Sequence, residues 1–298
     1  MRKAVILGGI ILSLSFVLQF LGSCATAQKV QKLEESANQD VFFQSARNRD
    51  VDDVKRLIKR GMDVNAQNKN GSTALMFASW DGCLTVAELL LMEGAFVDTR
   101  DSAGHTAMMY AALQGHVELV GLLIEKGACV NVQDEYGTSP LMYASHRGNR
   151  EVAKLLLENG ADSETRDSKG STALMTASYE GHADTAGLLI GKGACVNVQD
   201  EAGKTALMWA CKGGHVEIVK LLIEARADVN AQNEEGETAL MIAKEQNYIT
   251  IANLLVKAGA EQYEYNQPLR FDYLDTSCIN STSENKTAPL PFWGGGIE

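Results

Sequence analysis

Hydrophobic and polar positions repeat along this 298-residue chain with a period of 33 residues. Each period contains a short apolar stretch of the form Thr-Ala-Leu-Met-x-Ala, then a stretch with apolar residues at helical spacing, such as Val117, Val120 and Leu123. A turn with a recurring glycine opens each period, at Gly71, Gly104, Gly137, Gly170, Gly203 and Gly236. A fixed period of this length predicts an array of helix-turn-helix units that stack on one another.

The ends of both predicted helices carry consistent signals. A hydroxyl side chain precedes the first helix of each unit and is expected to act as its N-cap, at Thr73, Thr106, Ser139, Thr172, Thr205 and Thr238. A glycine ends most helices, because its backbone adopts positive φ without a steric penalty. No unit could bury its own apolar face, so stacking must complete the core.

The recurring motifs resemble the ankyrin repeat. Gly115-His116, Leu122-Leu123-Ile124 and residues 127–131 stand where the signature of that family stands. The resemblance implies an all-α solenoid of about seven helix-turn-helix units with extended, hairpin-like turns over residues 38–262. The expected units lie near 38–70, 71–103, 104–136, 137–169, 170–202, 203–235 and 236–262, and the terminal units resemble polar caps.

The chain departs from the family pattern at identifiable positions. The usual Thr-Pro-Leu-His becomes Thr-Ala-Leu-Met, only Pro140 keeps the proline, and packing is expected to replace the histidine hydrogen bond. Arg226 replaces a helix-ending glycine, at a cost of about 1 kcal/mol if φ is positive there. The substituting methionines form a ladder: Met76, Met109, Met142, Met175, Met208 and Met241.

The N-terminus indicates an extracytoplasmic location. A basic head, Met1-Arg2-Lys3, precedes an apolar run over residues 4–21 and then Leu21-Gly22-Ser23-Cys24. This resembles a bacterial lipoprotein signal, which implies a signal peptide at 1–23, lipidation of Cys24 and a polar tether over 24–37. Two alternatives remain: cleavage before Gln28 to release a soluble protein, and retention of the run as a membrane anchor.

Composition narrows the possible partners. The net charge is −11, and it becomes −13 without residues 1–23, so nucleic-acid binding is excluded as a main function. Of the six cysteines, Cys129 and Cys195 occupy equivalent positions about 20 Å apart, too far for a disulfide, and we expect no disulfide framework. Residues 263–298 lose the period and are expected to be disordered, or else to dock as a short peptide.

The family resemblance also implies a binding surface. Ankyrin proteins usually bind a protein partner on their concave side, at the turn tips and the exposed ends of the first helices. The residues at these positions that stand out are Trp80, Asp81, Tyr136, His146, Arg147, Tyr179 and Glu180. A second row is expected in the core between first helices: Phe77, Tyr110, Tyr143, Thr176, Trp209 and Ile242.

No catalytic, cofactor or metal site is expected. Gly203-Lys204-Thr205 lacks the earlier glycine of a phosphate loop, and His116, His182 and His215 occupy a structural position of the family motif. The sequence therefore predicts a monomeric, non-enzymatic binding module tethered to the bacterial cell envelope. Two alternatives are an inhibitor or immunity-type protein that blocks a periplasmic or secreted enzyme, and protection against oxidants by the methionine ladder.

Overall fold

The computed structural model describes residues 24–261, and side chains from residue 35 onward. This part of the chain contains 14 helices and no strands, so the predicted all-α class is confirmed. The first helices of the units are α2 (Cys24–Arg47), α4 (Ala74–Trp80), α6 (Ala107–Gln114), α8 (Pro140–His146), α10 (Ala173–Glu180), α12 (Ala206–Gly213) and α14 (Ala239–Glu245). The second helices are α3 (Val51–Lys59), α5 (Leu84–Met92), α7 (Val117–Glu125), α9 (Arg150–Glu158), α11 (Ala183–Gly191), α13 (Val216–Glu224) and α15 (Ile249–Lys257).

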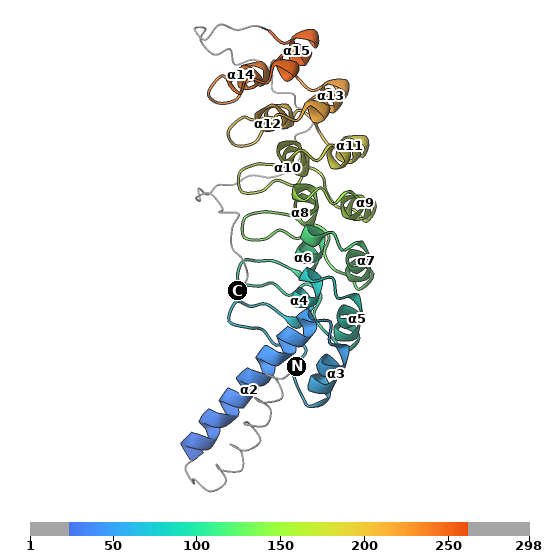
Figure 1. Cartoon of the computed structure of the whole chain (residues 1–298), viewed down its shortest axis with the longest axis vertical. Helices are drawn as coiled ribbons and strands as arrows, with labels where there is room; N and C mark the ends of the chain where they lie inside the picture. Colours follow the sequence, from blue (N-terminus) through green and yellow to red (C-terminus); the bar gives the residue numbers. More distant parts are fainter. Residues whose placement is uncertain (1–23, 262–298) are drawn as a thin grey trace.

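The helix pairs stack into an elongated array with two helical layers (Figure 1). Each first helix packs against the first helices of its neighbours, and each second helix does the same. The turns between units project together from one side of the array, beside the first-helix layer. The predicted signal peptide at 1–23 and the predicted disordered tail at 263–298 lie outside the described residues.

Hydroxyl caps start the first helices, as predicted, with one exception. The side chains of Thr73, Ser139, Thr172, Thr205 and Thr238 accept a hydrogen bond from the backbone N–H three residues later, at 3.3 to 3.4 Å. Thr106 makes no such bond, although it precedes α6, and its buried hydroxyl has no partner. The prediction of a side-chain cap at Thr106 was therefore wrong.

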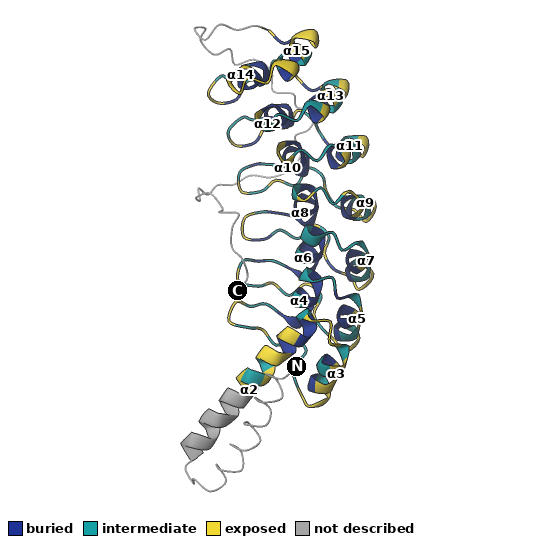
Figure 2. Ribbon diagram, viewed as in Figure 1, coloured by how far each residue is buried: buried dark blue, intermediate teal, exposed yellow. Residues whose placement is uncertain are grey.

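The core is continuous along the array, because each first helix from α4 to α12 buries most of its residues between its neighbours (Figure 2). Five methionines of the ladder are at most 2% exposed, and Met241 in the last unit is half-buried. The recurring small alanine is completely buried at Ala78, Ala111, Ala144, Ala177, Ala210 and Ala243. Unbranched methionine side chains fill the space between helices that these alanines allow to approach closely.

The N-terminal helix extends beyond the array. The predicted boundary between tether and array, at residue 38, falls inside α2, so residues 24–37 form the first part of a continuous helix. Near its C-terminal end, Phe42, Phe43 and Ala46 are buried where α2 packs against α3 and α4, and the ring centroids of Phe43 and Phe77 are 5.5 Å apart. At 1.5 Å per residue, Cys24 lies roughly 27 Å along the helix from Phe42.

The cysteines differ from the prediction in one respect. Cys83, Cys129 and Cys211 are free thiols, and burial raises the pKa of Cys211 to about 12. Cys195 is disulfide-bonded, so the expectation of no disulfide framework was wrong at this residue. Cys129 is not its partner, in agreement with the distance expected between equivalent positions of alternate units.

Arg226 adopts the strained backbone conformation that its position in the repeat requires. Its φ is +63°, whereas the equivalent Gly193 has φ +92° and no atom within 4 Å of a built Cβ. The strain at Arg226 thus comes from the backbone conformation.

We predict that Arg226→Gly stabilises the protein by about 1 kcal/mol, because glycine adopts positive φ without penalty. The free energy of urea unfolding measures the change. Gly193→Ala is the matched control at the equivalent position and is expected to destabilise by a similar amount. Equal stability of Arg226→Gly and the wild-type protein would contradict the assignment of strain.

Candidate functional site

The predicted contact residues lie on what we call the first-helix face, formed by the C-terminal ends of the first helices and the tips of the turns. Tyr136 is 44% exposed at a turn tip, and Tyr179 is 45% exposed at the end of α10. Arg147 and Glu180 are also exposed. Trp80, Asp81 and His146 are half-buried. The seven residues therefore share one face, but they are distributed over several units.

Neighbouring units connect several of these residues laterally. The Trp80 ring packs edge-on against Tyr110, with ring centroids 5.6 Å apart, and Tyr179 packs in the same way against Trp209, at 5.3 Å. His146 Nδ1 lies 3.2 Å from Glu180 Oε1. These contacts hold the half-buried side chains in place, which lowers the entropy that a partner would have to remove.

Asp81 has a structural partner. Arg47 Nε lies 3.3 Å from Asp81 Oδ2, and the Arg49 guanidinium donates a hydrogen bond to the Asp81 carbonyl at 3.0 Å. Both arginines belong to the first unit. Asp81 therefore links the first two units of the array, and it is the predicted contact residue with the clearest structural role.

Histidines at the start of the second helices hold successive units together. The Nε2 atoms of His116, His182 and His215 lie 2.8 to 3.1 Å from a first-helix carbonyl of the preceding unit, and since a carbonyl accepts, Nε2 carries the proton. Asn149 uses its amide in the same place, donating to the carbonyls of Ala112 and Leu113. The expectation of structural roles for these three histidines is confirmed.

The second aromatic row combines packing with hydrogen bonding, which the sequence reasoning missed. Tyr110 donates its hydroxyl to Asp101 Oδ2 at 2.5 Å, nine residues earlier. Tyr143 donates to Asp134 Oδ2 at 2.7 Å, and Trp209 Nε1 donates to Asp200 Oδ2 at 2.9 Å. The available signal was the nine-residue spacing between turn aspartates and aromatic residues in several units.

His105 joins two of these pairs. Its Nδ1 lies 3.4 Å from Asp101 Oδ2, and its Nε2 lies 3.6 Å from Asp134 Oδ2. Burial alone would raise the pKa of Asp101, but hydrogen bonds from His105, Tyr110 and two backbone amides outweigh it and hold the pKa at about 2. Burial, together with the bonded aspartates, raises the pKa of Tyr110 and Tyr143, so both tyrosines stay protonated.

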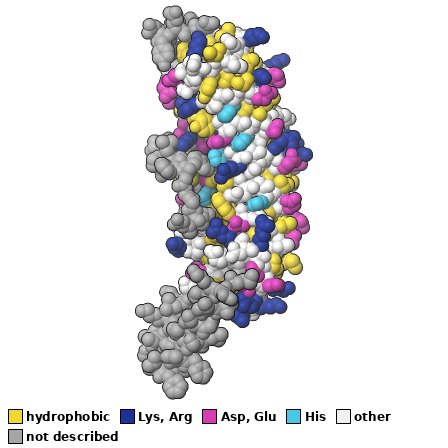
Figure 3. Space-filling view, in the orientation of Figure 1, with side chains coloured by type: hydrophobic (Ala, Val, Ile, Leu, Met, Phe, Trp, Pro, Cys, Tyr) yellow, Lys and Arg dark blue, Asp and Glu magenta, His cyan; other side chains and the backbone are white. Residues whose placement is uncertain are grey.

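The first-helix face is mixed in character. Imidazoles and hydrophobic side chains follow one another along the array, with acidic and basic groups beside them (Figure 3). Lys204 and Lys212 place their ammonium groups 5.5 and 5.0 Å from the centre of the Trp209 ring. Burial lowers the pKa of His146, partly offset by Glu180. A face of this kind suits a protein partner with apolar and polar groups in alternation.

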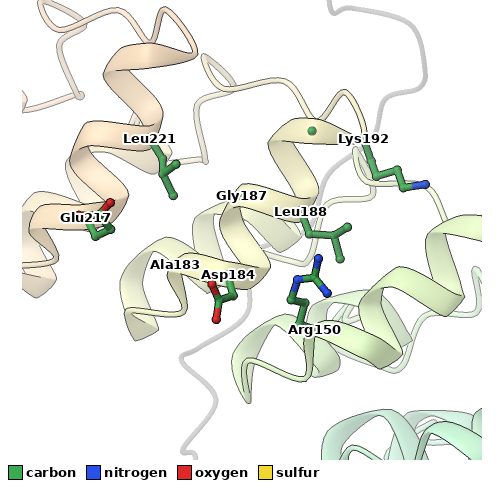
Figure 4. Close-up of a pocket in the computed structure, with 9 residues that line it drawn as sticks. Arg150, Ala183, Asp184, Gly187, Leu188, Lys192, Glu217 and Leu221 are labelled. Atoms are coloured by element: carbon green, nitrogen blue, oxygen red, sulfur yellow. The ribbon is translucent and has the colours of Figure 1, made fainter.

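A depression of about 520 Å³ lies in the second-helix layer, away from the predicted contact residues (Figure 4). It lies between α9 and α13, where α11 contributes the small residues Ala183, Gly187 and Gly191 beside Asp184 and Leu188. Three of the four charged side chains that line it are paired within the chain: Arg150 with Glu151, Lys192 with Glu158, and Glu217 with Lys220. Nothing in this depression provides a nucleophile with an adjacent base.

Two features are absent from residues 24–261. No group of three or more His, Cys, Asp or Glu side chains in this range is arranged to hold a metal ion. None of the helices in the same range is both long and apolar enough to cross a membrane.

The opposite environments of Asp101 and Asp167 predict opposite effects of charge removal. The lowered pKa of Asp101 means that its carboxylate stabilises the fold above about pH 4, and that this contribution is lost as the pH falls towards 2. Burial raises the pKa of Asp167, so its ionisation destabilises the fold as the pH rises through that pKa.

We therefore expect Asp101→Asn to lower the free energy of unfolding at pH 7 and to weaken its loss between pH 4 and 2. Asp167→Asn should leave stability at pH 7 unchanged or higher. Both variants preserve the turn, since Asn68 and Asn233 accept the same two backbone amides in their own units. Urea unfolding at pH 7, 4 and 2 measures the effects, and equal losses in both variants would contradict the assignment.

Comparison with known proteins agrees with this architecture. A family profile described as ankyrin repeats, in three copies, matches residues 14–101, 42–134, 81–167, 130–200 and 174–266. The crystal structure of the human ASB11 ankyrin repeat domain is similar, with 27% identity and a TM-score of 0.67, covering 74% of this chain and 99% of that one. No curated protein matches. The period, the stacked helix pairs and the family matches together show that this chain belongs to the ankyrin-repeat family.

Proposed function

We propose that this protein binds a protein partner on its first-helix face while Cys24 tethers it to the bacterial cell envelope. Ankyrin repeats are generally protein–protein interaction modules and typically non-enzymatic scaffolds. The observation that supports binding on this face is the exposure of two large aromatic side chains, Tyr136 and Tyr179, on a rigid surface. Exposed aromatic residues with fixed neighbours are common binding hot spots.

The turn tips add a pre-ordered rim to this surface. Backbone N–H groups at the tips donate to carbonyls of the preceding unit, as from Ser102 to Asn70 at 2.9 Å and from Ser168 to Tyr136 at 2.8 Å. These bonds hold each tip against the next. A partner that contacts Tyr136, Arg147, Tyr179 and Glu180 would therefore meet side chains on a backbone that is already ordered, which favours affinity.

The proposed tether rests on the signal-like N-terminus and on the form of α2. A lipid attached at Cys24 would sit at the first residue of this helix, and the array would begin roughly 27 Å away. A helical arm of this length would hold the first-helix face clear of the bilayer headgroups.

Of the other candidate functions, oxidant protection receives the least support from the structure. Five of the six ladder methionines are at most 2% exposed, so a dissolved oxidant reaches them only when the array opens. Inhibition of a periplasmic or secreted enzyme would use the same face as the proposed binding. Identification of the captured partner separates a scaffold from an inhibitor.

We expect the paired change Tyr136→Ala and Tyr179→Ala to reduce partner capture at least tenfold, because both rings are exposed on the binding face. The assay is crosslinked capture from envelope extract, with the purified protein as bait. The matched control changes two exposed apolar residues of the second-helix layer, Met92→Ala and Ile249→Ala. Equal capture by both double variants would refute binding on the first-helix face, provided that their melting temperatures match.

Cys24→Ser tests the tether separately. We expect the wild-type protein to be recovered with membranes and to carry a lipid-derived mass on Cys24, since two or more acyl chains give stable anchoring. The serine variant cannot form the thioether and should lose the added mass. A wild-type N-terminal peptide that begins at Gln28, without lipid, would support the secreted alternative instead.

A further inference from the structure

A row of turn residues follows one pairing rule along the array. The Oδ1 atom of each residue accepts hydrogen bonds from two backbone amides of the same turn. The rule relates the identity of the turn residue, aspartate or asparagine, to the residue nine positions later in the chain. Where that later residue is Tyr110, Tyr143 or Trp209, the turn residue is an aspartate whose Oδ2 accepts the aromatic donor. Where it is Phe77 or Ile242, which have no donor, the turn residue is an asparagine, Asn68 or Asn233.

Asp167 departs from this rule. Its Oδ1 accepts the amides of Lys169 and Ser171 at 2.8 Å, as its equivalents do. The residue nine positions later is Thr176, whose hydroxyl donates instead to the Thr172 carbonyl at 3.1 Å. No described group donates a hydrogen bond to Asp167 Oδ2, although the carboxyl is sufficiently buried for its pKa to be raised.

The missing ring leaves this acceptor at an open position of the first-helix face. Thr176 is much smaller than the tyrosine of the preceding unit or the tryptophan of the following one, and both Thr176 and Asp167 are only half-buried. The exposed Tyr179 lies one helical turn beyond Thr176 and packs against Trp209. The position therefore combines an unused carboxylate oxygen with aromatic surface.

We propose that this position binds a tyrosine side chain presented by the protein partner, whose phenol donates to Asp167 Oδ2. The two preceding units show the fit, because Tyr110 and Tyr143 place their hydroxyls 2.5 and 2.7 Å from the equivalent carboxylates. A phenol supplies the donor and the ring that Thr176 lacks. A lysine would suit the site less, since Lys169, Lys204 and Lys212 already lie near Asp167 or Trp209.

This inference rests on the proposed binding function but has its own test, which needs no partner. The probe is 4-methylphenol, the side chain of tyrosine, with toluene as the control that lacks the hydroxyl. Binding is followed by the NMR signal of the Trp209 indole N–H, with Trp80 as an internal reference. We expect a Kd on the order of 1–10 mM for 4-methylphenol, as suits a ligand of this size, and a Kd at least fivefold weaker for toluene.

Thr176→Tyr should fill the position from within the chain. We expect it to abolish 4-methylphenol binding and to raise the melting temperature by roughly 2–4 °C, because it restores the pair seen in the other units. Thr176→Val, which adds no ring, should leave binding of the probe unchanged. Asp167→Asn preserves the turn but removes the carboxylate. It should therefore weaken the binding of 4-methylphenol at least threefold and leave the binding of toluene unchanged.

Equal affinity for 4-methylphenol and toluene, or no saturable shift at Trp209, would overturn the proposal. Binding of 4-methylphenol to a folded Thr176→Tyr variant would also overturn the proposal. If Thr176→Tyr does not fold, the effect of Asp167→Asn on 4-methylphenol binding decides the matter. Partner capture that fails while 4-methylphenol binds would count against the proposed function and not against the site. If the partner is captured but 4-methylphenol does not bind, the proposed binding function stands and the proposed tyrosine site is refuted.

Discussion

The contact between successive units is the constraint on which the rest of this structure depends. No helix pair can bury its apolar face alone, so every unit needs a neighbour to complete its core. In the helical layers, the buried alanines and methionines make this contact. In the turns, hydrogen bonds make it. Side chains of Arg100, Gln133 and Arg166 each donate to the carbonyl of the residue 33 positions later, which extends the connection along the turns.

Because the contact between units is regular, a residue that departs from it can be compared with its equivalents in the other units. His116, His182 and His215 all bridge to a carbonyl of the preceding unit, and Asn149 does the same with an amide. A substitution that preserves the bond is therefore structural. Asp167 is different, because it keeps a carboxylate without the aromatic donor that the other aspartates have. Such a residue is the natural place to look for an external ligand.

The structure also changes how the two aromatic rows are understood. The sequence separated an exposed row containing Trp80 and Tyr179 from a buried row containing Tyr110 and Trp209. In the structure the rows are in contact, since Trp80 packs on Tyr110 and Tyr179 packs on Trp209. The half-buried rings of Tyr110 and Trp209 thus support Trp80 and Tyr179, and their hydrogen bonds to the turn aspartates connect the first helices to the turns. Binding side chains and packing side chains form one connected layer.

The sequence by itself determined the fold class, the 33-residue period and most helix caps, because these depend on local chemistry that recurs in every unit. Only the tertiary structure decided which polar groups meet across units. It showed that Thr106 leaves its hydroxyl unpartnered, that Asp81 pairs with Arg47, and that His105 lies between Asp101 and Asp134. These outcomes depend on the relative placement of separate units, and a periodic pattern carries no record of distances between side chains.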